Sequence, residues 1–238
     1  MNFAQALSTH FPQSLEASEY VSRTLEGLRP HGFQATNTIA CVSVCRDELT
    51  RPLVAHIQGV WGEAFNFSSL AGMLYLGTTG FQAAHHHAPN DDGCERYVYF
   101  AFPHIAIDAY GEIGRCFRSN RKDVSHACGA LLAFQKELAG GTVQLGLDPD
   151  NLEQSLLKQG LFRKLKYGEV PDLIHLTKMA SAVILEDLER MIQLTVDTSC
   201  NHYAVFTGIQ IHGPDSHTSI CPGIMYAVVN GQRHTLKL

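Results

Sequence analysis

Strand-like and helix-like segments alternate along this chain, and this alternation limits its fold more than any other feature. Runs rich in β-branched and aromatic residues predict strands at 37–45, 96–107, 203–212 and 224–229. Apolar residues at helical spacing predict helices at 12–29, 52–65, 124–138, 149–165 and 171–195. Because strands separated by helices favour a mainly parallel sheet flanked by helices, we expect an α/β fold.

We expect the chain to form one domain over residues 1–238. Hydrophobic residues make up 45% of the 238 positions, which is enough to bury one sizeable core. The sequence shows no internal repeat, low-complexity tract or linker. Residues 1–35 are predicted to form a helical N-terminal arm, since Pro30 stops the helix over 12–29.

The charge of the chain argues against two classes of partner. Its net charge is −5 with only 18 Lys and Arg residues, and no basic run is present to bind nucleic acid or an anionic membrane. No apolar stretch approaches the roughly 20 residues that span a bilayer, so we expect no membrane insertion.

The cysteines and the N-terminal residues indicate a reducing compartment. The seven cysteines are an odd number and are widely spread, and the first residues lack a signal-peptide pattern. We expect a cytoplasmic protein, or one in an organelle stroma if an upstream transit peptide has been removed.

Three residues at the edges of predicted elements form a candidate zinc site. Cys45 ends the first predicted strand, His104 lies towards the end of the strongest one, and Cys128 lies at the start of a helix. Sites in α/β sheets collect at the carboxyl ends of strands, and a helix N-terminus favours a thiolate. Three such ligands with the fourth position open to water are typical of a catalytic zinc site.

Two other residues compete for the ligand positions. Cys41 and Cys45 are about 13 Å apart in a strand, whereas Zn–S bonds are about 2.3 Å, so both cannot bind one ion. We take Cys45, because it stands at the strand end with Asp47 beside it. His126 is the alternative to His104, but it would reach the same ion as Cys128 only in a loop geometry.

Asp47 follows Cys45 by two positions and is the candidate catalytic carboxylate. An aspartate so close to a metal-binding cysteine can hold and orient a zinc-bound water.

The cluster His85-His86-His87 has three readings, as an adventitious metal site, a proton shuttle or a loop cap. The sequence lacks the Walker phosphate loop, the Gly-x-Ser-x-Gly elbow and the zinc-deaminase motif, which excludes those classes.

Several long motifs give the chain a resemblance to a known family. They are Cys45-Arg46-Asp47-Glu48, the segments 77–81 and 86–89, the long run 95–107, His126-Ala127-Cys128-Gly129-Ala130 and 207–213. With these motifs the chain resembles the limiting-CO2-inducible protein B/C family, which is related to theta-type carbonic anhydrases and similar in fold to beta carbonic anhydrases. The resemblance implies a zinc ion held by two cysteines and one histidine.

The chain also departs from the beta carbonic anhydrase pattern. That pattern pairs Cys-x-Asp-x-Arg with His-x-x-Cys-Gly, but position 49 is Leu here. The arginine partner of Asp47 must therefore come from elsewhere, with Arg46 as the first candidate and Arg51 as the second. His126 is one residue too close to Cys128 for the pattern, which favours His104 as the ligand.

The resemblance and the residues together predict a zinc-dependent lyase, a carbonic anhydrase that interconverts CO2 and bicarbonate. Zinc would lower the pKa of its bound water and supply hydroxide to attack CO2. We expect Phe81, Leu76 and His87 to line the substrate pocket. The alternative is a non-catalytic zinc protein that binds bicarbonate or a partner and regulates inorganic carbon uptake.

The expected assembly is a homodimer. Beta-type carbonic anhydrases complete their CO2 pocket with a second subunit, which the resemblance carries over as an expectation. The Gly-rich apolar segment 70–81 and the long helix over 171–195 also predict more hydrophobic surface than one small sheet covers.

Overall fold

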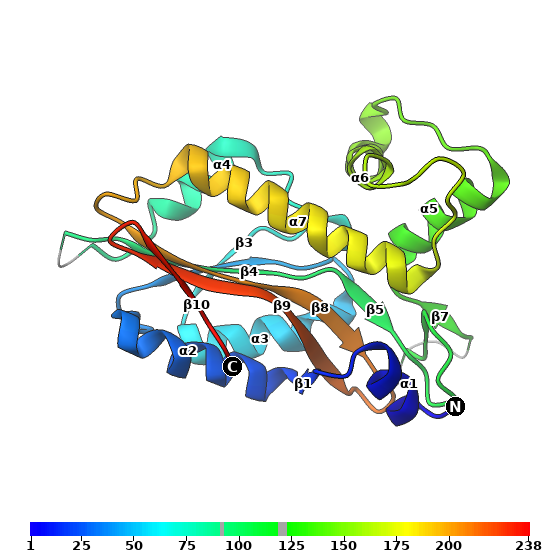
Figure 1. The fold of residues 1–238 in the computed structure, drawn as a ribbon, viewed down its shortest axis with the longest axis horizontal. Helices are drawn as coiled ribbons and strands as arrows, with labels where there is room; N and C mark the ends of the chain where they lie inside the picture. The colour runs from blue at the N-terminus through cyan, green and yellow to red at the C-terminus, as the bar shows by residue number, and fades with distance from the viewer. Residues whose placement is uncertain (91–92, 119–122) are drawn as a thin grey trace.

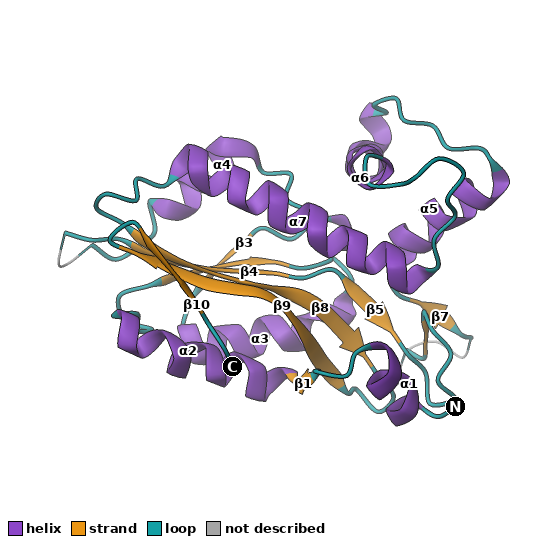
Figure 2. Ribbon diagram, in the orientation of Figure 1, coloured by secondary structure: helices purple, strands orange, loops and turns teal. Residues whose placement is uncertain are grey.

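The computed structural model describes residues 1–90, 93–118 and 123–238, and a mixed eight-stranded sheet lies at its centre (Figures 1 and 2). The strands of this sheet are β1 (Leu15–Glu16), β2 (Ile39–Ser43), β3 (Ala64–Asn66), β4 (Arg96–Ala101), β5 (His104–Ala106), β8 (His202–His212), β9 (Thr218–Val229) and β10 (Gln232–Thr235). A separate small sheet pairs β6 (Arg115–Cys116) with β7 (Ser125–His126).

The middle of the main sheet is parallel. The strand order is β1-β9-β8-β4-β2-β3, with β5 also paired to β8 and β10 to β9. The pairs β2/β3, β2/β4, β4/β8 and β5/β8 are parallel, whereas β9 joins β8, β1 and β10 in antiparallel fashion. The predicted α/β fold with a mainly parallel sheet is therefore confirmed, and β2, β5 and β8 end at the same edge of it.

Helices cover both faces of the sheet. They are α1 (Phe3–His10), α2 (Ala17–Leu28), α3 (Arg51–Trp61), α4 (Gly77–His85), α5 (Gly129–Gly140), α6 (Leu152–Phe162) and α7 (Leu173–Thr195). In Figure 1, α2 and α3 lie on one face and α4 and α7 on the other, while α6 stands away from the sheet. No helix among the described residues is long and apolar enough to cross a membrane.

The side chains of β4 alternate between the two buried faces. Tyr97 and Tyr99 belong to the core under α4 and α7, whereas Val98 and Phe100 belong to the core that α2 and α3 cover. A strand buried on both faces reads as a continuous apolar run, which explains why this run gave the strongest strand signal in the sequence.

Several predictions differ in detail from the structure. The strand predicted over 96–107 is divided into β4 and β5, and the helix predicted over 52–65 ends at Trp61 and is followed by β3. The helix predicted over 124–138 begins only at Gly129, because residues Ser125–His126 form β7 and Cys128 becomes the N-cap of α5. The segment 70–81 is a short 3-10 turn followed by α4. The apolar face of α7 is buried inside this chain, so the surplus hydrophobic surface predicted there is not exposed.

Gly72 shows why the 70–81 segment is rich in glycine. Its φ is +76°, and an added Cβ would lie 2.4 Å from the carbonyl oxygen of Phe102. A side chain would therefore clash with the backbone that leads into β5. The carbonyl of Gly72 also accepts a 2.9 Å hydrogen bond from Ser43 Oγ at the end of β2, so this segment braces the edge where the parallel strands end.

Candidate metal centre

Two cysteines and one histidine from distant parts of the chain meet at this edge. Cys45 follows β2, His104 begins β5 and Cys128 caps α5. One ligand atom from each residue lies within 4.8 Å of the other two, and all three residues are buried. The structure thus assembles the three predicted ligands into a group that can hold a metal ion.

The ring of His104 presents one nitrogen to this group. Its Nδ1 lies 3.0 Å from Nε2 of His212, the last residue of β8. Its Nε2 is buried and has no hydrogen-bond partner among the described residues. Because buried polar atoms are nearly always partnered, an orphaned imidazole nitrogen beside two thiols fits a metal ligand.

A hydrogen bond joins the two thiols and moves their pKa values in opposite directions. A hydrogen bond from Cys128, aided by His104 and the backbone N–H of Asp47, lowers the pKa of Cys45 to about 4 against the effect of burial. The same hydrogen bond, together with burial and the charge of Cys45, raises the pKa of Cys128 well above 9. A bound metal ion would replace the proton of this hydrogen bond, since thiolates are the metal-binding form.

The N-terminus of α5 assists Cys128. The backbone N–H groups of Ala130 and Leu131 donate hydrogen bonds to its sulfur and favour the thiolate. These are donors that a helix leaves unsatisfied in its first turn. The predicted role of the helix start at Cys128 therefore has a specific structural basis.

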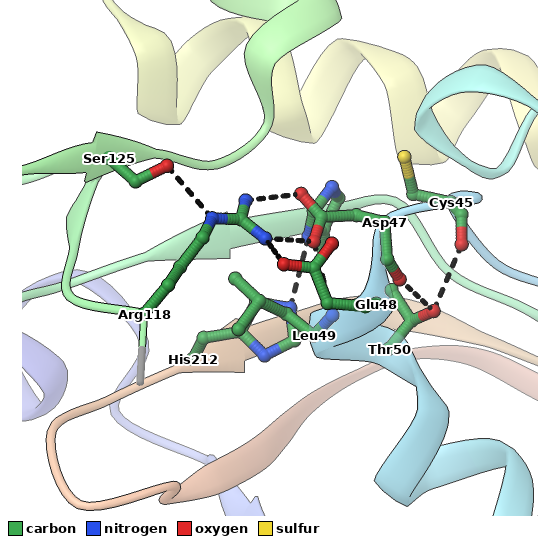
Figure 3. Close-up of polar contacts among 9 residues, drawn as sticks. Cys45, Asp47, Glu48, Leu49, Thr50, Arg118, Ser125 and His212 are labelled. Atoms are coloured by element: carbon green, nitrogen blue, oxygen red, sulfur yellow. Dashed lines mark hydrogen bonds and ion pairs between the residues drawn. The ribbon is translucent and has the colours of Figure 1, made fainter. Parts of the chain in front are cut away.

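The backbone N–H of Asp47 donates to the sulfur of Cys45, and its carboxylate is bound by Arg118 (Figure 3). Arg118 NH1 and NH2 donate hydrogen bonds of 2.9 and 2.8 Å to the two carboxylate oxygens, and Arg118 Nε donates to Ser125 Oγ at 2.8 Å. Burial opposes ionisation of Asp47, but the hydrogen bonds from Arg118 and Leu49 N–H outweigh it and lower the pKa of Asp47 to about 2. Asp47 is therefore ionised, and these hydrogen bonds hold its carboxylate in one orientation.

The prediction that Arg46 pairs with Asp47 is wrong, and so is the second choice, Arg51. Arg46 forms its ion pair with Glu153 of α6 at 2.5 Å, and Arg51 is an exposed residue at the start of α3. The true partner, Arg118, is 71 positions from Asp47. Local spacing cannot find such a partner, because the fold and not the sequence brings the two segments together.

The two alternative ligands, His126 and Cys41, lie outside the candidate metal group. His126 is exposed in β7, opposite Arg115, while His104 stands beside the thiols. Cys41 is fully inside the core under α4 and α7, where burial raises the pKa of its thiol.

Two cavities adjoin the site. The first, of about 460 Å³, is lined by Cys45, Arg46, Asp47 and Arg51 together with residues of α3 and β3. The second, of about 560 Å³, lies on the other side and is lined by Arg118, His212, the 213–218 turn and residues 107–109. Neither cavity is lined by His104 or Cys128, and only the first is lined by Cys45 and Asp47.

The three residues predicted to line the substrate pocket lie elsewhere. Phe81 is fully buried, with its ring centroid 4.6 Å from that of Phe67. Leu76 packs partly buried against the same core, and His87 is exposed with its ring 5.5 Å from Phe65. None of Phe81, Leu76 and His87 lines either of the two cavities, so their assignment stays a prediction without structural support.

Comparisons with known proteins point to one family. The family model described as limiting CO2-inducible proteins B/C beta carbonic anhydrases matches residues 14–229. The solved structure of limiting CO2-inducible protein LCIB is 35% identical, with a TM-score of 0.81 and 97% of each chain covered. PtLCIB4, a homolog of that protein, is 23% identical with a TM-score of 0.86, over 99% of this chain and all of its own, and shows the same fold. The chain has no significant match among curated proteins.

Proposed function

Since this chain belongs to the family of limiting-CO2-inducible proteins B and C and beta carbonic anhydrases, we propose that it is a zinc-dependent carbonic anhydrase. The reaction is CO2 + H2O ⇌ HCO3⁻ + H⁺. Zinc held by Cys45, His104 and Cys128 would lower the pKa of water from about 15.7 to about 7 and so supply hydroxide at neutral pH.

One observation carries the proposal. Among the described residues the candidate metal group has three protein ligands, and the carboxylate of Asp47 is engaged by Arg118. A structural zinc site has four protein ligands, whereas a catalytic site keeps one position for water or substrate. As long as the carboxylate of Asp47 stays bound to Arg118, it leaves the fourth position on the metal free.

Asp47 and Arg118 act on the reacting water through hydrogen bonds. The backbone N–H of Asp47 donates to the sulfur of Cys45, which fixes this residue against the site. Its ionised side chain would accept a hydrogen bond from the hydroxide and orient the lone pair of the oxygen towards CO2. Arg118 holds the carboxylate in that orientation and keeps it from closing the fourth position.

We assign the binding of CO2 and bicarbonate to the cavity that Cys45 and Asp47 line with residues of α3 and β3. Two arginines, Arg46 and Arg51, line it together with apolar Val44 and Val54. Arginine favours the bicarbonate anion, while the valines provide an apolar surface for CO2.

The enzyme is proposed to work as a homodimer. Exposed apolar side chains gather on and around α6, where Leu147 is 60%, Leu152 48% and Phe162 43% exposed. Apolar surface of this kind marks interfaces, and two-fold symmetry is the commonest way to cover it. Light scattering at micromolar concentration should give twice the mass of one chain, and the mass of a single chain with full activity would contradict the dimer.

Stopped-flow CO2 hydration on the zinc-loaded protein tests the proposed activity. The parent protein should hydrate CO2, whereas Asp47→Asn should keep one zinc per chain and lose activity by on the order of 100-fold, since the oriented carboxylate is gone. His126→Ala, which removes an exposed imidazole near the site, is the matched control and should keep both. One zinc per chain without CO2 hydration in the parent would sink the proposal and favour the non-catalytic zinc protein.

A further inference from the structure

His212 is the hydrogen-bond partner of the candidate metal ligand His104. The two rings meet edge to face with their centroids 5.1 Å apart, and Nε2 of His212 lies 3.0 Å from Nδ1 of His104. The side chain of His212 is buried, and the residue is only 4% exposed. No role for His212 follows from the chemistry proposed above.

The hydrogen bond determines which nitrogen of His104 can bind a metal ion. Nε2 of His104 is the atom left buried without a partner, and it must carry a lone pair in order to act as a ligand. The proton of a neutral His104 then lies on Nδ1, which donates to His212. Nε2 of His212 must therefore be the unprotonated acceptor.

We infer that His212 is a positioning residue that fixes the tautomer and the ring orientation of His104 for metal binding. The inference rests on the proposed zinc site. Partners of this kind to a ligating imidazole are worth about 10- to 100-fold in metal affinity.

The backbone of His212 is held firmly enough for this task. His212 pairs with Ala106 of β5 on one side and with Thr218 of β9 on the other. Its carbonyl accepts a 2.8 Å hydrogen bond from Ile107 N–H. His104 stands on the same strand two positions before Ala106, so both imidazoles project from one rigid, paired segment of the sheet.

The choice of histidine also suits a site with two thiolates. Ligating histidines commonly donate to a carboxylate or a carbonyl, and a carboxylate would add a further negative charge beside the metal. A neutral imidazole accepts the same hydrogen bond without that charge. His212 thus orients His104 while leaving the ion more electrophilic than a carboxylate partner would.

The sharpest test compares His212→Gln with His212→Met. The two side chains have nearly the same length and shape, but only glutamine has an oxygen that can accept a hydrogen bond from His104 Nδ1. Zinc affinity, measured by competition with a chromogenic chelator, should fall about 10- to 100-fold in His212→Met and by much less in His212→Gln. His126→Ala is the control and should bind zinc as the parent does.

A second readout separates positioning from a role in folding. The Co²⁺-substituted parent and His212→Gln should share one visible absorption spectrum, and His212→Met should differ from both, because the ring of His104 is no longer fixed. The thermal midpoints of the metal-free variants show whether both are folded. Equal zinc affinities and equal cobalt spectra in the Gln and Met variants would overturn the inference.

These measurements do not depend on turnover. A parent protein that binds zinc at this site but does not hydrate CO2 would defeat the proposed activity, and the Gln–Met comparison would still decide the role of His212. A parent protein that binds no zinc would overturn both.

Discussion

His85 and His104 are both buried histidines, but their surroundings differ. Nε2 of His85 lies 2.6 Å from the hydroxyl of Tyr99, and the ring also forms a hydrogen bond to the backbone of Thr195. The ring lies tilted against that of Tyr97, with the centroids 4.2 Å apart. His104 has one nitrogen bonded to His212 and the other directed at two thiols without a hydrogen-bond partner among the described residues.

The comparison shows how a structural imidazole differs from one that awaits a ligand. Both nitrogens of His85 are satisfied by the protein, and burial lowers its pKa to about 4, so it remains neutral at physiological pH. The structure gives His85 a packing role against Tyr97 and Tyr99, which is none of the three readings of the His85-His86-His87 cluster. An unpartnered ring nitrogen beside two thiols, and not burial alone, distinguishes His104 from His85.

The largest effect should come from removing a thiol. Cys45→Ser or Cys128→Ser should abolish zinc retention and CO2 hydration together, because a site with three protein ligands loses one thiolate. Elemental analysis after gel filtration measures the zinc. Full zinc occupancy in either variant would remove that cysteine from the ligand set.

Replacing His104 or His85 with alanine should have different effects, on zinc binding in the first case and on stability in the second. His104→Ala should lose zinc. His85→Ala should keep zinc but lower the free energy of unfolding by about 2–4 kcal/mol, since it leaves a cavity and an unpaired Tyr99 hydroxyl. Zinc content and urea unfolding of the two proteins measure this, and loss of zinc from His85→Ala with an intact fold would erase the distinction.

Arg118→Ala should change the pH dependence of stability. Asp47 has a pKa of about 2 in the folded protein, below the ordinary 3.8, so its ion pair stabilises the fold above about pH 4 and the contribution is lost as the pH falls towards 2. The variant should therefore be about 1–2 kcal/mol less stable at pH 7 and equal to the parent near pH 2.

Urea unfolding of the metal-free proteins at several pH values measures this difference. Arg233→Ala removes an exposed arginine far from the site and serves as the control. A destabilisation by Arg118→Ala that did not vary with pH would show that packing, and not the charge on Asp47, accounts for it.

The smallest effect concerns Gln210, the neighbour of His104 across β5 and β8. Both polar atoms of its amide are buried without a partner among the described residues. Gln210→Met removes them at similar volume and should stabilise the metal-free protein by about 1 kcal/mol. Thermal unfolding measures it. A destabilised variant would mean that the amide binds an ordered water or a ligand. Gln210 would then resemble His104, whose Nε2 lacks a hydrogen-bond partner among the described residues, and differ from His85, whose nitrogens both have one.

The elements could be predicted well because their signals are local. The alternation of strands and helices gave the α/β fold, and the end of the first predicted strand placed Cys45 at the edge of the sheet. His104 does not end a strand as predicted, because the run 96–107 is divided and His104 begins β5. The helix predicted over 124–138 begins too early, because residues 125–126 form a short strand that pairs with β6. A strand of two residues is too short to show an alternating pattern in the sequence.

By itself, the sequence determined the apolar periods, the Cys45-x-Asp47 spacing and the residue types able to bind zinc, since each of these depends on neighbours within a few positions. Only the tertiary structure decided that Arg118 holds Asp47 across 71 positions and that His212 holds His104 across 108. Ion pairs and hydrogen bonds act over about 3 Å, so their partners are set by which segments the fold brings together.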